Sequence, residues 1–173
     1  MMKTFLTITL AVFAVTFALA APAEADSFGA RLRGFEEVPA ISTEGQGFFF
    51  ASTNPGGTQM DYTLVYFSTS GTVQQAHIHI AQPGVNGGIV VFLCTNLGNG
   101  PGGAFTPPAC PNGTGVNAVA GNLAAGNVVA VTAQGIAASE FSEVIRAIRS
   151  GVAYANVHTD LFPGGEIRGQ VSQ

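Results

Sequence analysis

Alternation between apolar and polar side chains dominates the chain from residue 26 onward. In residues 59–67 an apolar side chain occupies every second position. Successive side chains of a strand point to opposite faces, so this pattern predicts a strand with one buried face. Similar patterns predict six more short strands, at residues 47–51, 73–80, 88–94, 127–133, 152–158 and 166–171.

Turn-forming residues separate the predicted strands. Proline and glycine stand together at residues 54–57, 82–84 and 163–165, and asparagine precedes two glycines at residues 86–88. Seven or more short strands with regular turns are typical of an antiparallel sandwich or barrel. We therefore predict an all-β fold, an antiparallel Greek-key-like β-sandwich or barrel.

One segment departs from the strand pattern. Residues 139–150 carry apolar side chains at helical spacing. Ser139 is the expected N-cap, and Arg146 and Arg149 lie where the negative end of the helix dipole favours cations. We predict a single short helix here that covers an edge or an end of the sheet, with its arginines facing solvent.

Composition narrows the class of protein. Hydrophobic residues make up 47% of the 173 residues, and the formal net charge is −4. So much apolar material argues against a disordered chain. The acidic balance argues against nucleic-acid binding, because no cationic surface is present to displace counterions from phosphates.

The segment 1–25 follows the layout of a secretory signal peptide. Lys3 precedes an uncharged apolar run from Thr4 to Ala20, and three overlapping or adjacent A-x-A patterns follow at its end. We predict cleavage after Ala20 or Ala25, which leaves residues 26–173 as one exported domain, extracellular or periplasmic, with no membrane segment. An N-terminal membrane anchor is the alternative.

Cys94 and Cys110 are the only two cysteines, and a segment rich in glycine and proline separates them. Export to an oxidising compartment favours a disulfide between them. Closing a loop of this size stabilises a fold by roughly 3 kcal/mol in the chain-entropy model. The alternative is a redox-active or metal-binding thiol pair, although such pairs usually have C-x-x-C spacing.

Three histidines are the most informative candidates for chemistry. His77 and His79 share one face of a predicted strand, and His158 ends another. If the two strands are neighbours, the three imidazoles converge on one accessible patch that is able to bind copper or zinc. The alternative is a structural role, in which the imidazoles form hydrogen bonds within the sheet, for example to Gln75 or Asn156.

Carboxylates near these segments have two candidate roles. Asp160 and Glu166 are able to ligate a metal or to fix the tautomer of a ligand imidazole. Glu166 and Arg168 share a face of the last predicted strand, and we expect them to form structural ion pairs. The expected partners are each other or acidic residues across the sheet, namely Glu36, Glu37 and Asp61. No motif of a hydrolase, a P-loop protein or a zinc protease is present, so we predict no enzymatic activity.

Four ordered motifs resemble the CHRD (chordin-type) domain family. They are E-V-P at residues 37–39, A-H-I-H at 76–79, Y-A-N-V-H-T at 154–159 and G-E-I-R-G-Q at 165–170. The resemblance covers about residues 28–172 and implies an extracellular all-β module. The polar positions of these motifs that we expect to support the fold are Glu37, Asn156, Glu166 and Arg168. The implied role is non-enzymatic, as a structural module or as a binder of an extracellular protein or glycan.

A weaker likeness connects the chain with Cu/Zn superoxide dismutase. That Greek-key sandwich also uses an H-x-H strand pair and a late V-H for copper, and by this likeness His77, His79 and His158 match copper ligands. No further histidine remains for a bridging ligand or a zinc subsite, so dismutase activity is not expected. The alternative function is therefore an exported protein that binds copper or zinc at a three-histidine patch.

Overall fold

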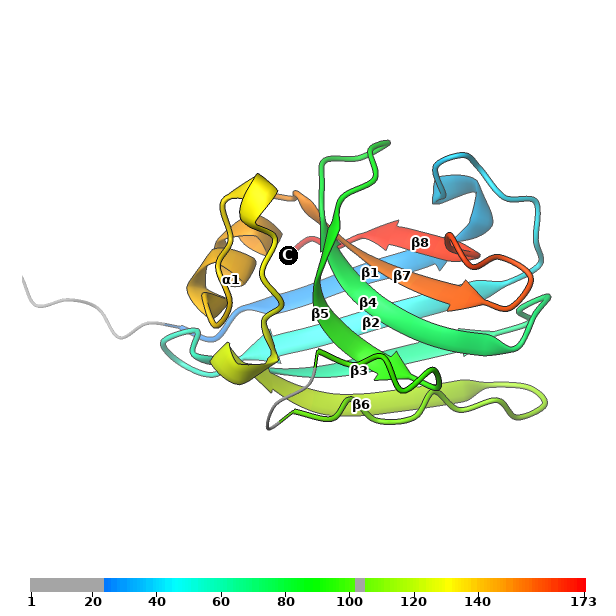
Figure 1. Ribbon diagram of the computed structural model, residues 1–173, viewed down its shortest axis with the longest axis horizontal. Coiled ribbons are helices and arrows are strands. Elements are labelled where there is room, and N and C mark those ends of the chain that lie inside the picture. Colours follow the sequence, from blue (N-terminus) through cyan, green and yellow to red (C-terminus); the bar gives the residue numbers. More distant parts are fainter. Residues whose placement is uncertain (1–23, 102–104) are drawn as a thin grey trace, which may run out of the picture.

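The computed structural model describes residues 24–101 and 105–173, and residues 1–23 of the predicted signal peptide lie outside this range. Within it, eight antiparallel strands form one nearly closed sheet with a single α-helix (Figure 1). The strands are β1 (Ser27–Arg33), β2 (Gln46–Thr53), β3 (Gln59–Phe67), β4 (Val73–Ile80), β5 (Gly88–Thr95), β6 (Asn117–Ala124), β7 (Ala153–Thr159) and β8 (Ile167–Gln170). The predicted all-β class is confirmed.

The order of strands in the sheet is β5-β4-β7-β8-β1-β2-β3-β6. The two end strands, β5 and β6, contact each other and nearly close the barrel. The chain crosses from β6 back to β7, which pairs with β4, so residues 73–80 and 153–159 lie side by side although they are distant in sequence. This non-local pair positions the candidate site.

The core lies inside the barrel. Alternate side chains of every strand point inward, as the predicted two-residue period requires. Tyr62 on β3 crosses the interior and donates its hydroxyl hydrogen to the carbonyl of Leu93 on β5, at 2.5 Å. This bond satisfies a buried hydroxyl and connects two non-adjacent strands. Fully buried core side chains include Leu32, Phe49, Leu64, Ile78, Leu93 and Val157.

The predicted strand at residues 127–133 is wrong. A 3-10 turn (Ala125–Asn127) begins this segment, and Val131 makes only an isolated bridge to Ile136. Val128 is buried and Val131 packs against the core, so the apolar run covers the core from a loop instead of joining the ladder. An apolar run shows that side chains are buried, but it does not show how their backbone is paired.

Two strands were not predicted, β1 and β6. Both contain many small or polar residues, and each buries few large side chains, such as Phe28 and Leu32 in β1 and Val119 and Leu123 in β6. Their pairing with β2 and β3 decides their conformation. The other six predicted strands correspond to β2, β3, β4, β5, β7 and β8.

The helix α1 (Phe141–Arg149) lies at one end of the barrel, where its apolar face is buried against the core (Figure 1). The single short helix is confirmed, but its predicted N-cap is wrong. Ser139 has a φ of 68° and precedes the helix, and Glu140 is the N-cap. Arg146 and Arg149 do lie in the last turn, where Arg149 pairs with Asp26 at 2.5 Å.

Cys94 and Cys110 form a disulfide with a Cα–Cα distance of 5.1 Å, so the predicted pairing is confirmed. Asn96 holds the same loop, because its amide accepts from the Cys110 N–H and donates to the Cys110 carbonyl. None of the helices in the described ranges has the length and apolar character needed to cross a membrane.

Candidate metal centre

The pairing of β4 with β7 assembles the three histidines. His77 lies opposite Asn156 and His79 lies opposite Tyr154 in this antiparallel ladder. Ala76, Ile78 and Val157 point into the core, so the histidines of both strands point to the outer face of the barrel. Strands β4 and β7 are neighbours, which is the condition under which the sequence predicted that the three imidazoles converge.

The three imidazoles form one compact cluster. One nitrogen from each of His77, His79 and His158 lies within 4.8 Å of the other two. The ring centroids are 5.0 to 5.7 Å apart. Metal–nitrogen bonds of about 2.0–2.1 Å put two nitrogens of one coordination shell roughly 3.3–3.6 Å apart. Side-chain rotations that move the rings inward by about 1 Å therefore bring the cluster to ligand separations.

The cluster is buried, whereas the sequence suggested an accessible patch. His77 is fully buried, and His79 and His158 are each 6% exposed. Two loops contact the cluster, residues 81–87 between β4 and β5 at His79 and residues 160–166 between β7 and β8 at His158. Periodicity identified the face on which the histidines lie, but it gave no sign that loops cover that face.

Hydrogen bonds to these loops fix the state of two imidazoles. His79 Nδ1 lies 3.0 Å from the Gly87 carbonyl oxygen, and His158 Nδ1 lies 3.0 Å from that of Pro163. A carbonyl only accepts, so we assign the ring hydrogen to Nδ1 in both cases, which leaves a lone pair on each Nε2. Both Nε2 atoms, and both ring nitrogens of His77, are buried and have no hydrogen-bond partner among residues 24–101 and 105–173.

The hydrogen-bond partners of the histidines differ from those that the sequence predicted. The imidazoles are held by loop carbonyls and not by Gln75 or Asn156, and Asp160 and Glu166 do not fix their tautomers. A backbone carbonyl that holds the second nitrogen of a histidine is a common feature of metal sites. In this structure the two carbonyls orient the rings of His79 and His158.

Burial keeps the imidazoles neutral. Desolvation, reinforced by the neighbouring histidines, lowers the pKa of His77 to about 2. Desolvation also lowers the pKa of His79 to about 4, against the opposing effect of its bond to Gly87, and it lowers the pKa of His158. Neutral imidazole is the form that binds a metal, so the ligand state is present at neutral pH.

Two aromatic rings border the cluster. Phe92 on β5 packs edge-on against His77, with centroids 4.4 Å apart. Tyr154 on β7 stacks on His79 at 4.8 Å, and the Arg168 guanidinium lies 3.4 Å from the centroid of the same tyrosine ring. The Tyr154 hydroxyl accepts the Gly87 N–H at 3.1 Å. Gly87 therefore holds both rings of the stacked pair, His79 through its carbonyl and Tyr154 through its N–H.

Comparison with known families agrees with the motifs around this cluster. The family model described as the CHRD domain matches residues 28–171. The chain belongs to the CHRD domain family. Neither the curated proteins nor the solved structures contain a match, so the likeness to Cu/Zn superoxide dismutase stays a prediction.

Glu37, the glutamate of the E-V-P motif, lies near Asn156 of the Y-A-N-V-H-T motif in this CHRD domain. Glu37 is buried, and burial raises its pKa to about 7, although Arg168 acts in the opposite direction. A Cβ atom at Gly165 would lie 2.6 Å from Glu37 Oε1 and 2.7 Å from Asn156 Nδ2. In the part of the chain that the structure describes, Glu37 Oε1 and Asn156 Oδ1 have no hydrogen-bond partner. The sequence indicates Glu37 and Asn156 as positions that support the fold, but it does not show that they pack against Gly165, because the three residues lie on separate segments.

Glu166 and Arg168 of the CHRD domain do not pair with each other, contrary to one expectation. Among the described residues, the ion pairs join Arg146 with Glu143 and Arg149 with Asp26. Glu166 instead accepts hydrogen bonds from two threonine hydroxyls and two backbone N–H groups, those of Thr43, Thr159, Ser70 and Gly71. Arg168 donates to Asn86 Oδ1 and to the Val85 carbonyl. Both side chains therefore fasten loops to the sheet.

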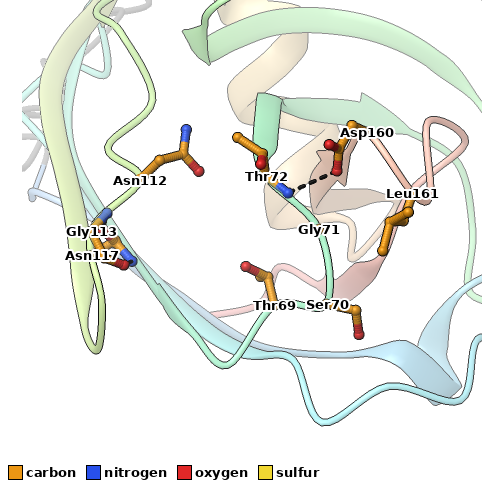
Figure 2. Close-up of a pocket in the computed structure, with 9 residues that line it drawn as sticks. All are labelled: Thr69, Ser70, Gly71, Thr72, Asn112, Gly113, Asn117, Asp160 and Leu161. Carbon is orange, nitrogen blue, oxygen red and sulfur yellow. Dashed lines mark hydrogen bonds between the residues drawn. The ribbon is translucent and has the colours of Figure 1, made fainter.

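A polar pocket of the CHRD domain, about 360 Å³ in volume, has a lining that includes none of the three histidines. Figure 2 shows Asn112 and Asn117 on one side of it and Asp160 and Leu161 on the other. The polar groups drawn there are largely used within the fold. The Asn112 amide bonds the backbone of Val73 and Cys110, and Asp160 accepts from the Thr72 N–H. The cavity therefore offers few free groups to a ligand.

Proposed function

We propose that this CHRD domain binds a transition-metal ion, copper or zinc, through His77, His79 and His158. The observation that supports the proposal is the set of buried nitrogens without partners, four of them on three rings that converge within 4.8 Å. A buried polar atom without a hydrogen bond costs about 1–3 kcal/mol and is rare in folded proteins. A metal ion would supply the missing partner for one nitrogen on each ring.

The histidine states favour the metal-binding role over a structural role. In a structural cluster, we would expect the inward nitrogens to find donors or acceptors, as the two outward Nδ1 atoms do. Here the carbonyls fix two rings so that their free lone pairs remain inside the cluster. This is the orientation in which imidazole serves as a ligand.

We also propose that the chain works outside the cytoplasm, and that its role is binding and not catalysis. Support comes from the signal-peptide pattern of the segment 1–25 and from the disulfide between Cys94 and Cys110. A protein or glycan partner remains the alternative to a metal.

Calorimetric titration of the purified, metal-free protein with Zn(II), Cu(II) and Cu(I) tests the proposal. We expect one ion to bind per chain, and we expect the double variant His77→Ala/His79→Ala to lose this binding. Gln75→Ala is the matched control, because Gln75 belongs to the same strand and its side-chain oxygen accepts from the Asn99 amide. Equal binding by the double variant, or no binding by the folded wild type, would refute the proposal. Circular dichroism checks that each variant is folded.

A further inference from the structure

Resting on the proposed metal site, we infer that the three-histidine cluster selects Cu(I) over Zn(II) and Cu(II). The inference follows from the charge and number of the ligands, from the depth of the site and from the nearest buried cation. Each of these is a property of side chains described above.

The ligand set carries no charge. Among residues 24–101 and 105–173, the group of metal-ligating side chains at this position contains His77, His79 and His158 alone. Asp160 and Glu166 are engaged elsewhere, with Thr72 and with Thr43 and Thr159. A bound ion therefore keeps its whole charge in a buried place. In the idealised Born description the cost of burial grows with the square of the charge, so a divalent ion costs about four times as much as a monovalent one.

The nearest buried cation adds to this effect. Arg168 is only 2% exposed, and its guanidinium packs on the Tyr154 ring that also stacks on His79. The guanidinium and the His79 ring both pack on Tyr154, so the positive charge of Arg168 lies close to a candidate ligand and repels a cation bound there. Repulsion of this kind is twice as large for a divalent ion as for a monovalent one. Glu37 interacts with Arg168, but burial raises the pKa of Glu37 to about 7, so this carboxyl offsets the arginine charge only in part at neutral pH.

The number of ligands, like the charge, favours Cu(I). Zn(II) sites in proteins usually have four ligands, either four side chains or three with a water molecule. Cu(I) has a filled d shell and is stable with two or three nitrogen ligands. Phe92 packs edge-on against His77, so part of the space next to the cluster is filled by apolar atoms. Three imidazoles suffice for Cu(I), whereas Zn(II) also needs room for a water molecule beside them, and Phe92 fills part of that space.

Competition titrations on the wild-type protein test the inference directly. Cu(I) is measured against a colorimetric Cu(I) chelator under anaerobic reducing conditions, and Zn(II) and Cu(II) are measured against chelators of their own. We expect Cu(I) to bind at least about a hundredfold more tightly than Zn(II), because of the charge difference. We also expect the reduction potential of bound copper to lie above that of the aqueous ion, since the protein stabilises the reduced state.

The variant Arg168→Gln provides a second test. Removal of the buried charge is expected to reduce the preference for Cu(I) over Zn(II) about tenfold. Cu(I) should still bind, but more weakly, because Arg168 also bonds Val85 and Asn86 of the loop that contains Gly87. Arg33→Gln is the matched control, because Arg33 pairs with Arg168 in register but is exposed, and its removal should leave the preference unchanged. Circular dichroism shows whether Arg168→Gln is folded, and the wild-type titrations do not depend on it.

The possible results separate this inference from the proposal on which it rests. Zn(II) or Cu(II) bound as tightly as Cu(I) would overturn the preference and leave the metal site standing. Failure of all three ions to bind would refute the site, and the preference with it. Tight Cu(I) binding with weak Zn(II) binding would support both.

Discussion

His79 and Tyr154 lie opposite each other across the β4–β7 ladder, and their rings stack almost parallel, at an angle of 6° and a centroid distance of 4.8 Å. The backbone of Gly87 contacts both side chains of this pair. Its carbonyl lies 3.0 Å from His79 Nδ1, and its N–H donates to the Tyr154 hydroxyl. The orientation of one candidate ligand therefore depends on a tyrosine that is not itself a ligand.

Tyr154→Phe tests this dependence. The substitution removes the acceptor of the Gly87 N–H, so we expect the free energy of unfolding to fall by about 1 kcal/mol. We also expect Cu(I) affinity to fall several-fold, because Gly87 holds His79 less firmly. Tyr66→Phe is the control, since it removes a hydroxyl that bonds the Pro111 carbonyl outside the cluster. The control should lose stability and keep its Cu(I) affinity. Urea unfolding and chelator competition measure the two quantities.

The buried histidines make the metal-free protein sensitive to acid. The pKa of His77 is lowered to about 2 and that of His79 to about 4, from an ordinary value of 6.5. Below pH 6.5 the unfolded chain binds protons at these positions and the folded chain does not, so stability falls as the pH falls. We expect the urea midpoint to decrease steadily from pH 6.5 to pH 4. A flat profile over this range would show that the histidines are solvated in the folded state.

Glu37 has the opposite dependence on pH. Its pKa is raised from 4.5 to about 7, chiefly by burial, so the folded state binds a proton that the unfolded state has released. Its contribution to stability is fully present below pH 4.5 and is lost as the pH rises through 7. Between pH 6.5 and 8 the histidines stabilise both proteins as the pH rises, so we expect the free energy of unfolding of Glu37→Gln to rise relative to that of the wild type, in which Glu37 loses its proton. Urea midpoints at pH 6.5, 7.25 and 8 give the comparison, and parallel profiles would contradict this role of Glu37.

The strands that carry the site were predictable from sequence because their periodicity is strong. In β4, Ala76, Ile78 and Ile80 alternate with the histidines, and burial of the first set fixes the direction of the second. Small residues in β1 and β6 gave no comparable pattern. Their conformation follows from the strands beside them, which is information that a local window does not contain.

The environment of the histidines was not predictable for a related reason. Their acceptors, the carbonyls of Gly87 and Pro163, belong to loops, and backbone carbonyls have no sequence signature. The burial of Glu37 likewise depends on packing against Gly165, near the other end of the chain. A motif identified these residues as a set, but only the fold shows that they are packed against one another.

Gly165→Ala is expected to be the most disruptive of these substitutions. Gly165 has a φ of 130°, which residues with a side chain rarely adopt, and a Cβ there would lie 2.6 Å from Glu37 Oε1. Backbone strain and the clash with a buried carboxylate act together, so we expect a loss of more than about 2 kcal/mol in the free energy of unfolding. Gly164→Ala is the matched control, because its Cβ would meet nothing within 4 Å. Urea unfolding of both variants decides the matter: equal stability would mean that the loop moves away from Glu37 at little cost, and the buried contact among Glu37, Asn156 and Gly165 would then not be a fixed part of the fold.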